Sequence, residues 1–284
     1  MVTHSAKANE LAIDGASFDA FERAGWERVA TAYHDFAGGI TPRIVEPLLD
    51  AAGVGPGDDV LDVACGPGYA AAQAAARGAA AVGVDIAHAM IALARRRYPD
   101  VEFQPGDAHA LAFADGSFDA VVGNLALHHF GEPERAAGEF ARVLAPGGRL
   151  ALSVWDLPAR ARHVGVLLDA VAHAGAAPPP DLPAGPEFFR FSYEPELVGL
   201  FTRHGFEGVT VRDVSFLHTI ASPDELWDGL VGGTVRTAAV VQGQPEPVRR
   251  RIRDAFERFL EVHRTGDHLE VPVSVKLAAG FAAG

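Results

Sequence analysis

Apolar residues occur along the chain in two different patterns, which predict alternating strands and helices over its middle part. Short apolar runs bounded by Gly, Pro and Asp predict strands at residues 59–64, 81–86, 101–104, 118–124 and 149–155. Apolar side chains every three or four residues predict intervening helices at residues 69–77, 87–97 and 132–145. This alternation is typical of a doubly wound, mostly parallel α/β sheet, which binds its ligand outside the carboxyl ends of the strands.

Helical patterns flank this core on both sides. Residues 1–58 carry apolar and aromatic side chains at helical spacing, Tyr33 and Phe36 among them, and predict a helical cap on the sheet. Beyond Trp155 the same reasoning predicts further helices at 160–174, 194–204, from 223 onward and at 245–264. The last two strands are expected at 208–218 and 270–278, so helical insertions follow the fifth and the sixth strand.

The chain is interpreted as a single domain with three consecutive parts. These parts are the helical cap at 1–58, a ligand-binding core at 59–155, and substrate-covering helices with the last two strands at 156–284. The third part contains a proline-rich loop with four candidate substrate contacts, namely Phe188, Phe189, Phe191 and Tyr193. The alternative is a loop held to the surface by its own phenylalanines.

A glycine-containing turn after the first predicted strand carries the strongest chemical signal. The run is Val60-Leu61-Asp62-Val63-Ala64-Cys65-Gly66-Pro67-Gly68. Gly66 and Gly68 allow a sharp turn and a close approach of the backbone to a ligand. Asp85 ends the next predicted strand, where a carboxylate accepts hydrogen bonds from both hydroxyls of a ribose. The pattern therefore predicts an adenosine-containing ligand.

Two ligand classes use this arrangement, and the details favour one of them. A dinucleotide site needs G-x-G-x-x-G, whereas Tyr69-Ala70-Ala71 stands here in place of the third glycine. Asp62 would repel a phosphate but suits the ammonium group of a zwitterionic ligand. These features favour S-adenosylmethionine over a nicotinamide dinucleotide.

Three further motifs follow in order: Gly106-Asp107-Ala108, the run from Phe118 to Phe130, and the run from Arg142 to Leu150. With them the chain resembles the class I S-adenosylmethionine-dependent methyltransferases, most strongly over residues 25–155. The chain departs from the family's D/E-x-G-x-G-x-G motif at one position. There Ala64 replaces the first glycine, and this small residue is expected to fit. The resemblance implies a Rossmann-like fold with an N-terminal helical lid, in which Tyr33 lies over the cofactor.

The resemblance also assigns cofactor contacts position by position. It places the methionine end of the cofactor at Asp62, Ala64, Gly66 and Gly68. It places the ribose at Asp85 and the adenine at Ile86, Asp107 and Ala108, with Asp107 accepting a hydrogen bond from the amino group. The methionine moiety and the transferable methyl group are expected beside Asn124 and Leu125.

Two histidines are candidate catalytic bases. His128 and His129 follow the fourth predicted strand, near the expected position of the methyl group. A histidine is the natural base near neutral pH, although a neutral amine acceptor needs none, and the pair then only orders the loop. The remaining histidines lack the spacing of metal ligands, so no metal site is expected.

Composition narrows the class of partner. The formal net charge of −13 argues against nucleic acid and anionic membrane surfaces, because both require basic residues that neutralise phosphates. No apolar run approaches membrane-spanning length, and the single cysteine, Cys65, suits a reducing compartment. A cytoplasmic protein with a small-molecule substrate is expected, and the sequence leaves room for a homodimer.

The sequence therefore predicts methyl transfer from S-adenosylmethionine to an oxygen, nitrogen or carbon atom of a small molecule, such as a specialised metabolite. One alternative keeps the cofactor site but catalyses a non-methylating reaction such as a cyclisation, because acceptor chemistry depends on other residues. A second alternative is an NAD-dependent oxidoreductase, which the missing glycine and Asp62 disfavour.

Overall fold

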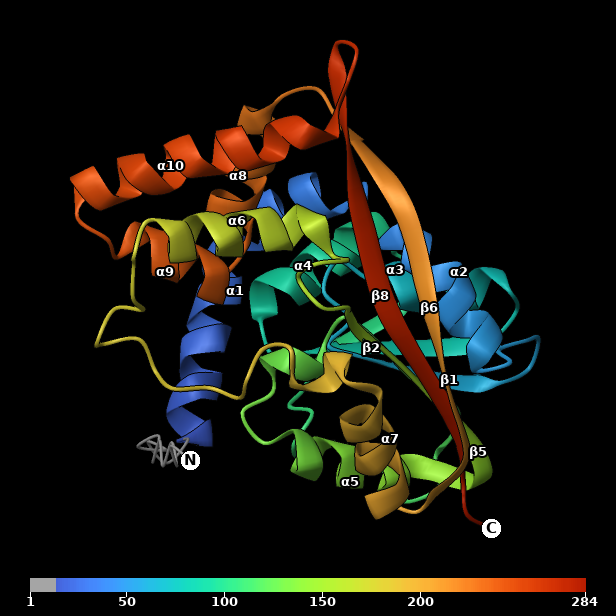
Figure 1. Cartoon of the computed structure of the whole chain (residues 1–284). Helices are drawn as coiled ribbons and strands as arrows, with labels where there is room; N and C mark the ends of the chain where they lie inside the picture. The colour runs from blue at the N-terminus through green and yellow to red at the C-terminus, as the bar shows by residue number, and fades with distance from the viewer. Residues whose placement is uncertain (1–13) are drawn as a thin grey trace, which may run out of the picture.

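The computed structural model describes residues 14–284, which form one eight-stranded sheet with helices on both faces (Figure 1). The strand order is β3-β2-β1-β4-β5-β8-β6, and β7 pairs with β8 outside this path. The strands are β1 (Asp59–Val63), β2 (Ala80–Asp85), β3 (Glu102–Pro105), β4 (Phe118–Asn124), β5 (Leu144–Trp155), β6 (Phe206–Ile220), β7 (Arg264–Thr265) and β8 (His268–Ala282). Strands β1 to β5 pair in parallel, whereas β8 is antiparallel to β5 and β6.

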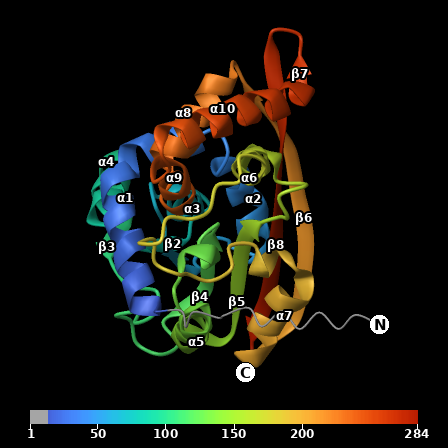
Figure 2. The same ribbon diagram turned by 60° about the vertical axis from the view of Figure 1, so that its left-hand side comes forward.

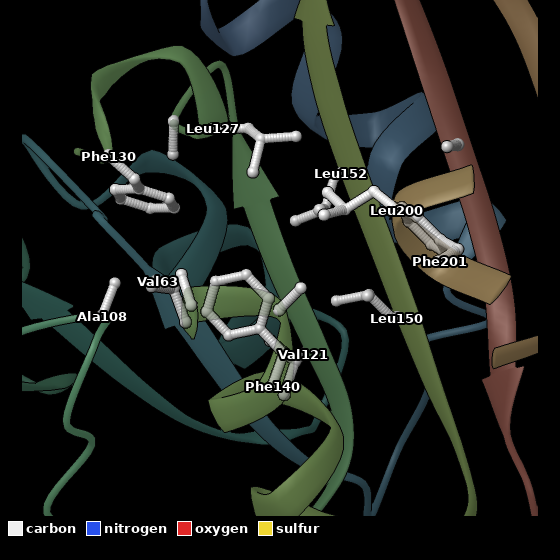
Figure 3. Packing of buried hydrophobic residues seen from close by; sticks show 14 of the residues in the cluster. Val63, Ala108, Val121, Leu127, Phe130, Phe140, Leu150, Leu152, Leu200 and Phe201 are labelled. Atoms are coloured by element: carbon white, nitrogen blue, oxygen red, sulfur yellow. The ribbon is translucent and has the colours of Figure 1, made fainter. Parts of the chain in front are cut away.

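Helices pack on the two faces of the sheet according to the alternation of side chains along its strands. Val60 joins the cluster beneath α2 (Pro42–Ala51) and α3 (Tyr69–Ala76). Leu61 and Val63 join the opposite cluster, beneath α5 (Pro133–Val143) and α7 (Glu194–Arg203). Figure 3 shows Phe140 of α5 beside Val63 and Val121 in that cluster. The edge formed by β2 and β3 is covered by α4 (His88–Arg97).

The long strands β6 and β8 extend beyond the parallel part of the sheet and support a second core. Ile220, Leu269 and Val271 pack there with side chains of four helices, α6 (Arg162–His173), α8 (Pro223–Gly233), α9 (Arg236–Gln242) and α10 (Glu246–Leu260). In Figure 1 these helices form a layer over the end of the sheet from which β5 leads into α6. Short 3-10 turns complete the described chain: η1 (Leu127–His129), η2 (Arg190–Ser192) and η3 (Glu261–His263).

Helix α1 (Gly15–Ala37) lies along the side of the molecule between α4 and α8 (Figure 2). Glycines let it approach its neighbours closely. A Cβ added at Gly25 would lie 2.3 Å from Cγ1 of Val235, and one added at Gly229 would lie 2.0 Å from Cδ2 of Phe36. These contacts fix α1 against the layer that contains α8.

The Rossmann-like, doubly wound α/β fold predicted from the sequence is confirmed, with helical insertions after β5 and after β6. The division into a single domain with three parts stays a prediction, and residues 1–13 of its helical cap lie outside the described residues. The helix predicted to end at residue 145 ends at Val143, because Leu144 already pairs with Phe118 as the start of β5.

Two elements were not predicted. Helix α9 is separate from α8 because Thr234 adopts an extended backbone, and its hydroxyl accepts a hydrogen bond from the N–H of Ala238 at 3.2 Å. Strand β7, Arg264–Thr265, is too short to show a periodic pattern. Helix α8 begins with Pro223 and is capped by Ser222, whose Oγ accepts a hydrogen bond from the N–H of Glu225 at 3.3 Å.

We expect Gly25→Ala to lower the free energy of unfolding by about 1 to 3 kcal/mol, the usual cost of overpacking. The added Cβ would lie 2.3 and 2.7 Å from the two methyl carbons of Val235. Gly232→Ala in α8 is the matched control, because its Cβ would meet nothing within 4 Å. Alanine is the better helix former, so the control should gain up to about 1 kcal/mol. Urea denaturation measures both variants, and equal shifts would contradict a close contact at Gly25.

Candidate active site

A cavity lies at the carboxyl ends of β1, β2 and β4, beneath α1. Most of the predicted cofactor residues line it, namely Tyr33, Ala64, Gly66, Asp85, Ile86, Asp107, Ala108, Asn124 and Leu125. Side chains that the motifs did not point to complete its wall, among them Asp19, Glu22, Trp26 and His109. We call this space the inner cavity. Of the predicted cofactor residues, Asp62 and Gly68 do not line it.

The turn after β1 has a left-handed backbone at three positions. Gly66 has φ +51° and Gly68 has φ +87°. A side chain on Gly68 would also collide with Phe103, since its Cβ would lie 2.7 Å from the ring. Gly68 is therefore needed for the turn itself. Ala64, which replaces the family's first glycine, fits at φ +53°, a conformation that is strained for any residue with a Cβ.

Asp85 connects this turn to the neighbouring elements. Its Oδ2 accepts a hydrogen bond from the N–H of Gly66, and its Oδ1 accepts one from the N–H of Ala87, both at 2.9 Å. Burial raises the pKa of Asp85 to about 6 against the effect of these two bonds. A carboxylate oxygen can accept more than one hydrogen bond, so Asp85 keeps acceptor capacity on a wall of the inner cavity.

Asp62 takes a different position from the one expected. Its side chain points to the face of the sheet covered by α3, and its Oδ2 accepts a hydrogen bond from the N–H of Ala71 at 2.9 Å. Burial raises its pKa to about 7. Asp62 lines a small neighbouring cavity together with Tyr69 and Asn124. Its direct contact is thus with the start of α3, because alternation along β1 turns it away from the inner cavity.

Asp107 forms a pair with a histidine that the sequence analysis did not single out. Its Oδ1 accepts hydrogen bonds from the N–H of His109 and from Nδ1 of the same residue, both at 2.9 Å. The bond with His109 holds the pKa of Asp107 below its usual value. His109 is buried, and its Nε2 accepts a hydrogen bond from the N–H of Glu132 at 3.3 Å.

Asn124 and Leu125 form the end of β4. The amide of Asn124 is held on both sides, since Nδ2 donates to the carbonyl of Thr41 at 3.2 Å and Oδ1 accepts from Ser153 Oγ at 2.7 Å. Leu125 has φ +59°, the second strained position with a Cβ in the described chain. Both residues contact the inner cavity, and Asn124 also ties α2 to the sheet.

A second cavity adjoins the inner one, and we call it the outer cavity. Four residues line both spaces, namely Trp26, Tyr33, Leu125 and His129. The rest of the outer wall is mainly apolar and aromatic, with Phe36, Ile40, Trp155, Val164, Phe188, Leu230 and Val235. His163, Thr234, Arg236 and Thr237 supply polar groups. The shared residues make a boundary across which two ligands could meet.

His129 lies on this boundary with a fixed orientation. Its Nδ1 lies 2.9 Å from Oε2 of Glu22, which also accepts a hydrogen bond from Nε1 of Trp26 at 2.9 Å. Glu22 is buried, and its Oε1 has no partner within residues 14–284. A carboxylate on Nδ1 selects the tautomer with the proton there, which leaves Nε2 as the acceptor nitrogen.

His128 is not placed as expected for a base. It lines neither cavity and is buried between the rings of His129 and Phe188, at centroid distances of 4.2 and 4.4 Å. Neither of its nitrogens has a partner within the described residues, and burial holds its pKa well below the usual value. A base must reach its substrate, so this placement favours His129 over His128, and the catalytic role of His128 stays a prediction.

The proline-rich loop contributes less than expected. Phe188 lines the outer cavity, but Phe191 is fully buried in the main core and Tyr193 is 52% exposed.

Within residues 14–284 no helix is long and apolar enough to cross a membrane. The same residues contain no group of three or more His, Cys, Asp or Glu side chains that could hold a metal ion.

Sequence reasoning missed Glu22 and His109, although both left a signal. Glu22 stands on the apolar face of α1, one turn after Phe18 and one turn before Trp26, where a charged residue has to find a partner. His109 follows Asp107 by two positions, within reach of a short side-chain hydrogen bond. Neither signal identifies its partner in space.

Comparison with known proteins shows what the chain is similar to in sequence. Residues 61–152 match the family described as methyltransferase domain. The demethylmenaquinone methyltransferase of Renibacterium salmoninarum is 42% identical over 120 residues, which are 42% of this chain and 51% of that relative. The matched region thus spans about half the length of the relative.

Solved structures are similar over most of the chain. The cyclase SpnF has a TM-score of 0.57 at 19% identity, covering 93% of this chain and 97% of SpnF. Phosphoethanolamine N-methyltransferase 2 of Haemonchus contortus, solved with phosphomonomethylethanolamine and S-adenosylhomocysteine, has a TM-score of 0.57 at 16% identity. That match covers 94% of this chain and 60% of the Haemonchus chain. At these identities the likeness establishes the fold.

The raised pKa of Asp62 makes stability depend on pH. A carboxyl group whose pKa is higher in the folded state stabilises the fold below its unfolded pKa, and this contribution is lost as the pH rises through about 7. Between about pH 5 and pH 8 the wild type should lose about 2 to 3 kcal/mol more unfolding free energy than Asp62→Asn. Urea denaturation at both pH values measures this difference. Parallel pH profiles would show that Asp62 is not buried as a neutral acid.

Proposed function

We propose that this chain, whose residues 61–152 match the methyltransferase-domain family, transfers a methyl group from S-adenosylmethionine to an oxygen, nitrogen or carbon atom of a small molecule. A specialised metabolite is the expected acceptor. The observation that carries the proposal is the pair of adjoining cavities, which share Tyr33, Leu125 and His129 on their boundary. A cofactor in the inner cavity and an acceptor in the outer one would then face each other.

The inner cavity fits this cofactor. A Cβ added to Gly66 would come no closer than 4.0 Å to its nearest neighbour, Tyr33, so the glycine leaves open space beside the backbone. Asp85 would receive the ribose hydroxyls, and Ile86 would pack on the adenine. Asp107 would accept from the adenine amino group, with Ala108 as the backbone donor. The acidic groups Glu22 and Asp85 suit the positive charge of the sulfonium and ammonium groups.

The chain itself would orient the acceptor, exclude water and remove a proton. When bound, S-adenosylmethionine supplies an electrophilic methyl group on a cationic sulfur. The helix α1 and the aromatic wall of the outer cavity would keep water from the reacting atoms. His129 would accept a proton at Nε2 from a hydroxyl or acidic carbon, and Glu22 would stabilise the imidazolium that forms.

The second candidate is a non-methylating reaction such as a cyclisation on the same fold. Its support is the shared fold of the cyclase SpnF, which matches 93% of this chain at 19% identity, and a methyltransferase structure matches with the same TM-score of 0.57. An NAD-dependent oxidoreductase is disfavoured, because the turn after β1 lacks the third glycine and Glu22 and Asp85 place acidic groups at the inner cavity. We also propose a cytoplasmic location, a small-molecule substrate rather than nucleic acid, and a homodimer as the assembly to be tested.

Calorimetry should show binding of S-adenosylhomocysteine and no binding of NAD. Asp85→Ala should weaken the binding about 10- to 100-fold, because it removes charge-assisted hydrogen bonds to the ribose. Asp100→Ala on the exposed surface is the control and should leave the affinity unchanged. Binding of NAD alone would refute the cofactor assignment.

Labelled methyl groups should appear in the product, and turnover without label transfer would favour the cyclisation instead.

His129→Ala should lower kcat about 10²- to 10⁴-fold, while the affinity for S-adenosylhomocysteine stays nearly the same. Glu22→Gln should lower kcat less, because it removes the orienting charge but keeps the imidazole. His128→Leu should mainly change thermal stability, since this ring lines neither cavity. A loss confined to KM in His129→Ala would instead assign the residue to acceptor binding.

A further inference from the structure

The outer cavity has a single arginine in its wall and no lysine among the described residues that line it. This residue, Arg236, begins α9 and is partly buried. Its Nη1 donates a hydrogen bond to the carbonyl of Pro186 at 2.6 Å, and its guanidinium lies 5.5 Å from the centre of the Phe18 ring. Both neighbours are uncharged, so neither neutralises the cation.

Arg236 forms no ion pair within residues 14–284. The carboxylate of Glu22 raises the pKa of Arg236, and the charge of Arg236 in turn lowers the pKa of the buried His128. Burial lowers the pKa of Arg236 from its high usual value, and an arginine stays protonated in proteins. A partly buried arginine normally has a carboxylate partner. The guanidinium of Arg236 has five N–H donors and uses one of them for the carbonyl of Pro186, so others can bind a ligand.

The remaining wall of the outer cavity suits a flat apolar ligand. Trp26, Trp155 and Phe188 present aromatic rings to it. The ring of His163 lies tilted against Trp155 at a centroid distance of 4.4 Å, and neither of its nitrogens has a partner within the described residues. Burial lowers the pKa of His163 to about 3, so the ring is neutral and adds no second positive charge.

We propose that the acceptor is an aromatic compound with a carboxylate or another anionic group, which Arg236 binds in the outer cavity. This inference rests on the proposed function, since it specifies the acceptor of the same site. The net charge of −13 repels an anion at long range, so the attraction has to come from this one local cation. Arginine suits the task because its planar donors match a carboxylate in two parallel hydrogen bonds.

The test compares two probes that differ in one charged group. Protein saturated with S-adenosylhomocysteine is titrated at about pH 7.5 with 1-hydroxy-2-naphthoate and, separately, with 1-naphthol, and quenching of tryptophan fluorescence reports binding. Trp26 and Trp155 lie in the cavity wall and supply the signal. The wild type should bind the carboxylate about 10- to 100-fold more tightly than the naphthol.

Variants then assign the preference to Arg236. Arg236→Met should reduce the ratio of the two dissociation constants to about 1, and Arg236→Lys should keep part of the preference. Arg96→Met, an exposed arginine on α4, is the matched control and should keep the full preference. A thermal melt of each variant, together with its affinity for S-adenosylhomocysteine, shows that the fold and the inner cavity are intact.

Several outcomes overturn the inference. The absence of a carboxylate preference in the wild type, an unchanged preference in Arg236→Met, or failure of both naphthalenes to bind would each do so. A loss of folding in both Arg236 variants, with the fold restored by adding Glu22→Gln, would show that the arginine only balances the charge of Glu22. Failure of S-adenosylhomocysteine to bind would instead refute the proposed function.

Discussion

The two hydrogen bonds accepted by Asp85 hold together the parts of the chain that form the ligand site. They join the turn after β1, through Gly66, to the start of α4, through Ala87. The carboxyl group is almost completely buried, so these bonds form where water does not compete. Gly66 keeps its left-handed conformation in part because its N–H is fixed by this acceptor. The inner cavity depends on that fixed turn.

Much of the sheet could be predicted because its strands are short apolar runs whose residues alternate between two covered faces. Leu61 and Val63 on one face and Val60 on the other show this alternation directly. The motif positions Gly66, Asp85 and Asp107 were predictable for the same reason, since the carboxyl ends of parallel strands meet at one edge. The sequence showed the charge of Asp62 but not the hydrogen bond that its side chain accepts from the N–H of Ala71.

The wall of the outer cavity could be predicted only in part: His129 and Phe188 were candidates, but their neighbours are far apart in the sequence. Glu22 comes from α1, His129 from the turn after β4 and Arg236 from α9, and no local pattern relates the three. Their unusual polar positions become visible only when burial is known. Glu22 Oε1 and both nitrogens of His163 lack partners within residues 14–284, and such groups are costly unless a ligand or water satisfies them.

The close contact of α1 with α8 has a consequence for the way the chain folds. Gly25 of α1 meets Val235, and Phe36 meets Gly229, so the first described helix is held by segments near the other end of the sequence. During synthesis α1 leaves the ribosome long before α8 and α9 exist. It can pack on α4 earlier, but its face toward α8 stays uncovered until most of the chain has been made. The closing of the outer cavity, whose wall includes Leu230 and Arg236, is therefore a late folding event, governed by contacts of high sequence separation.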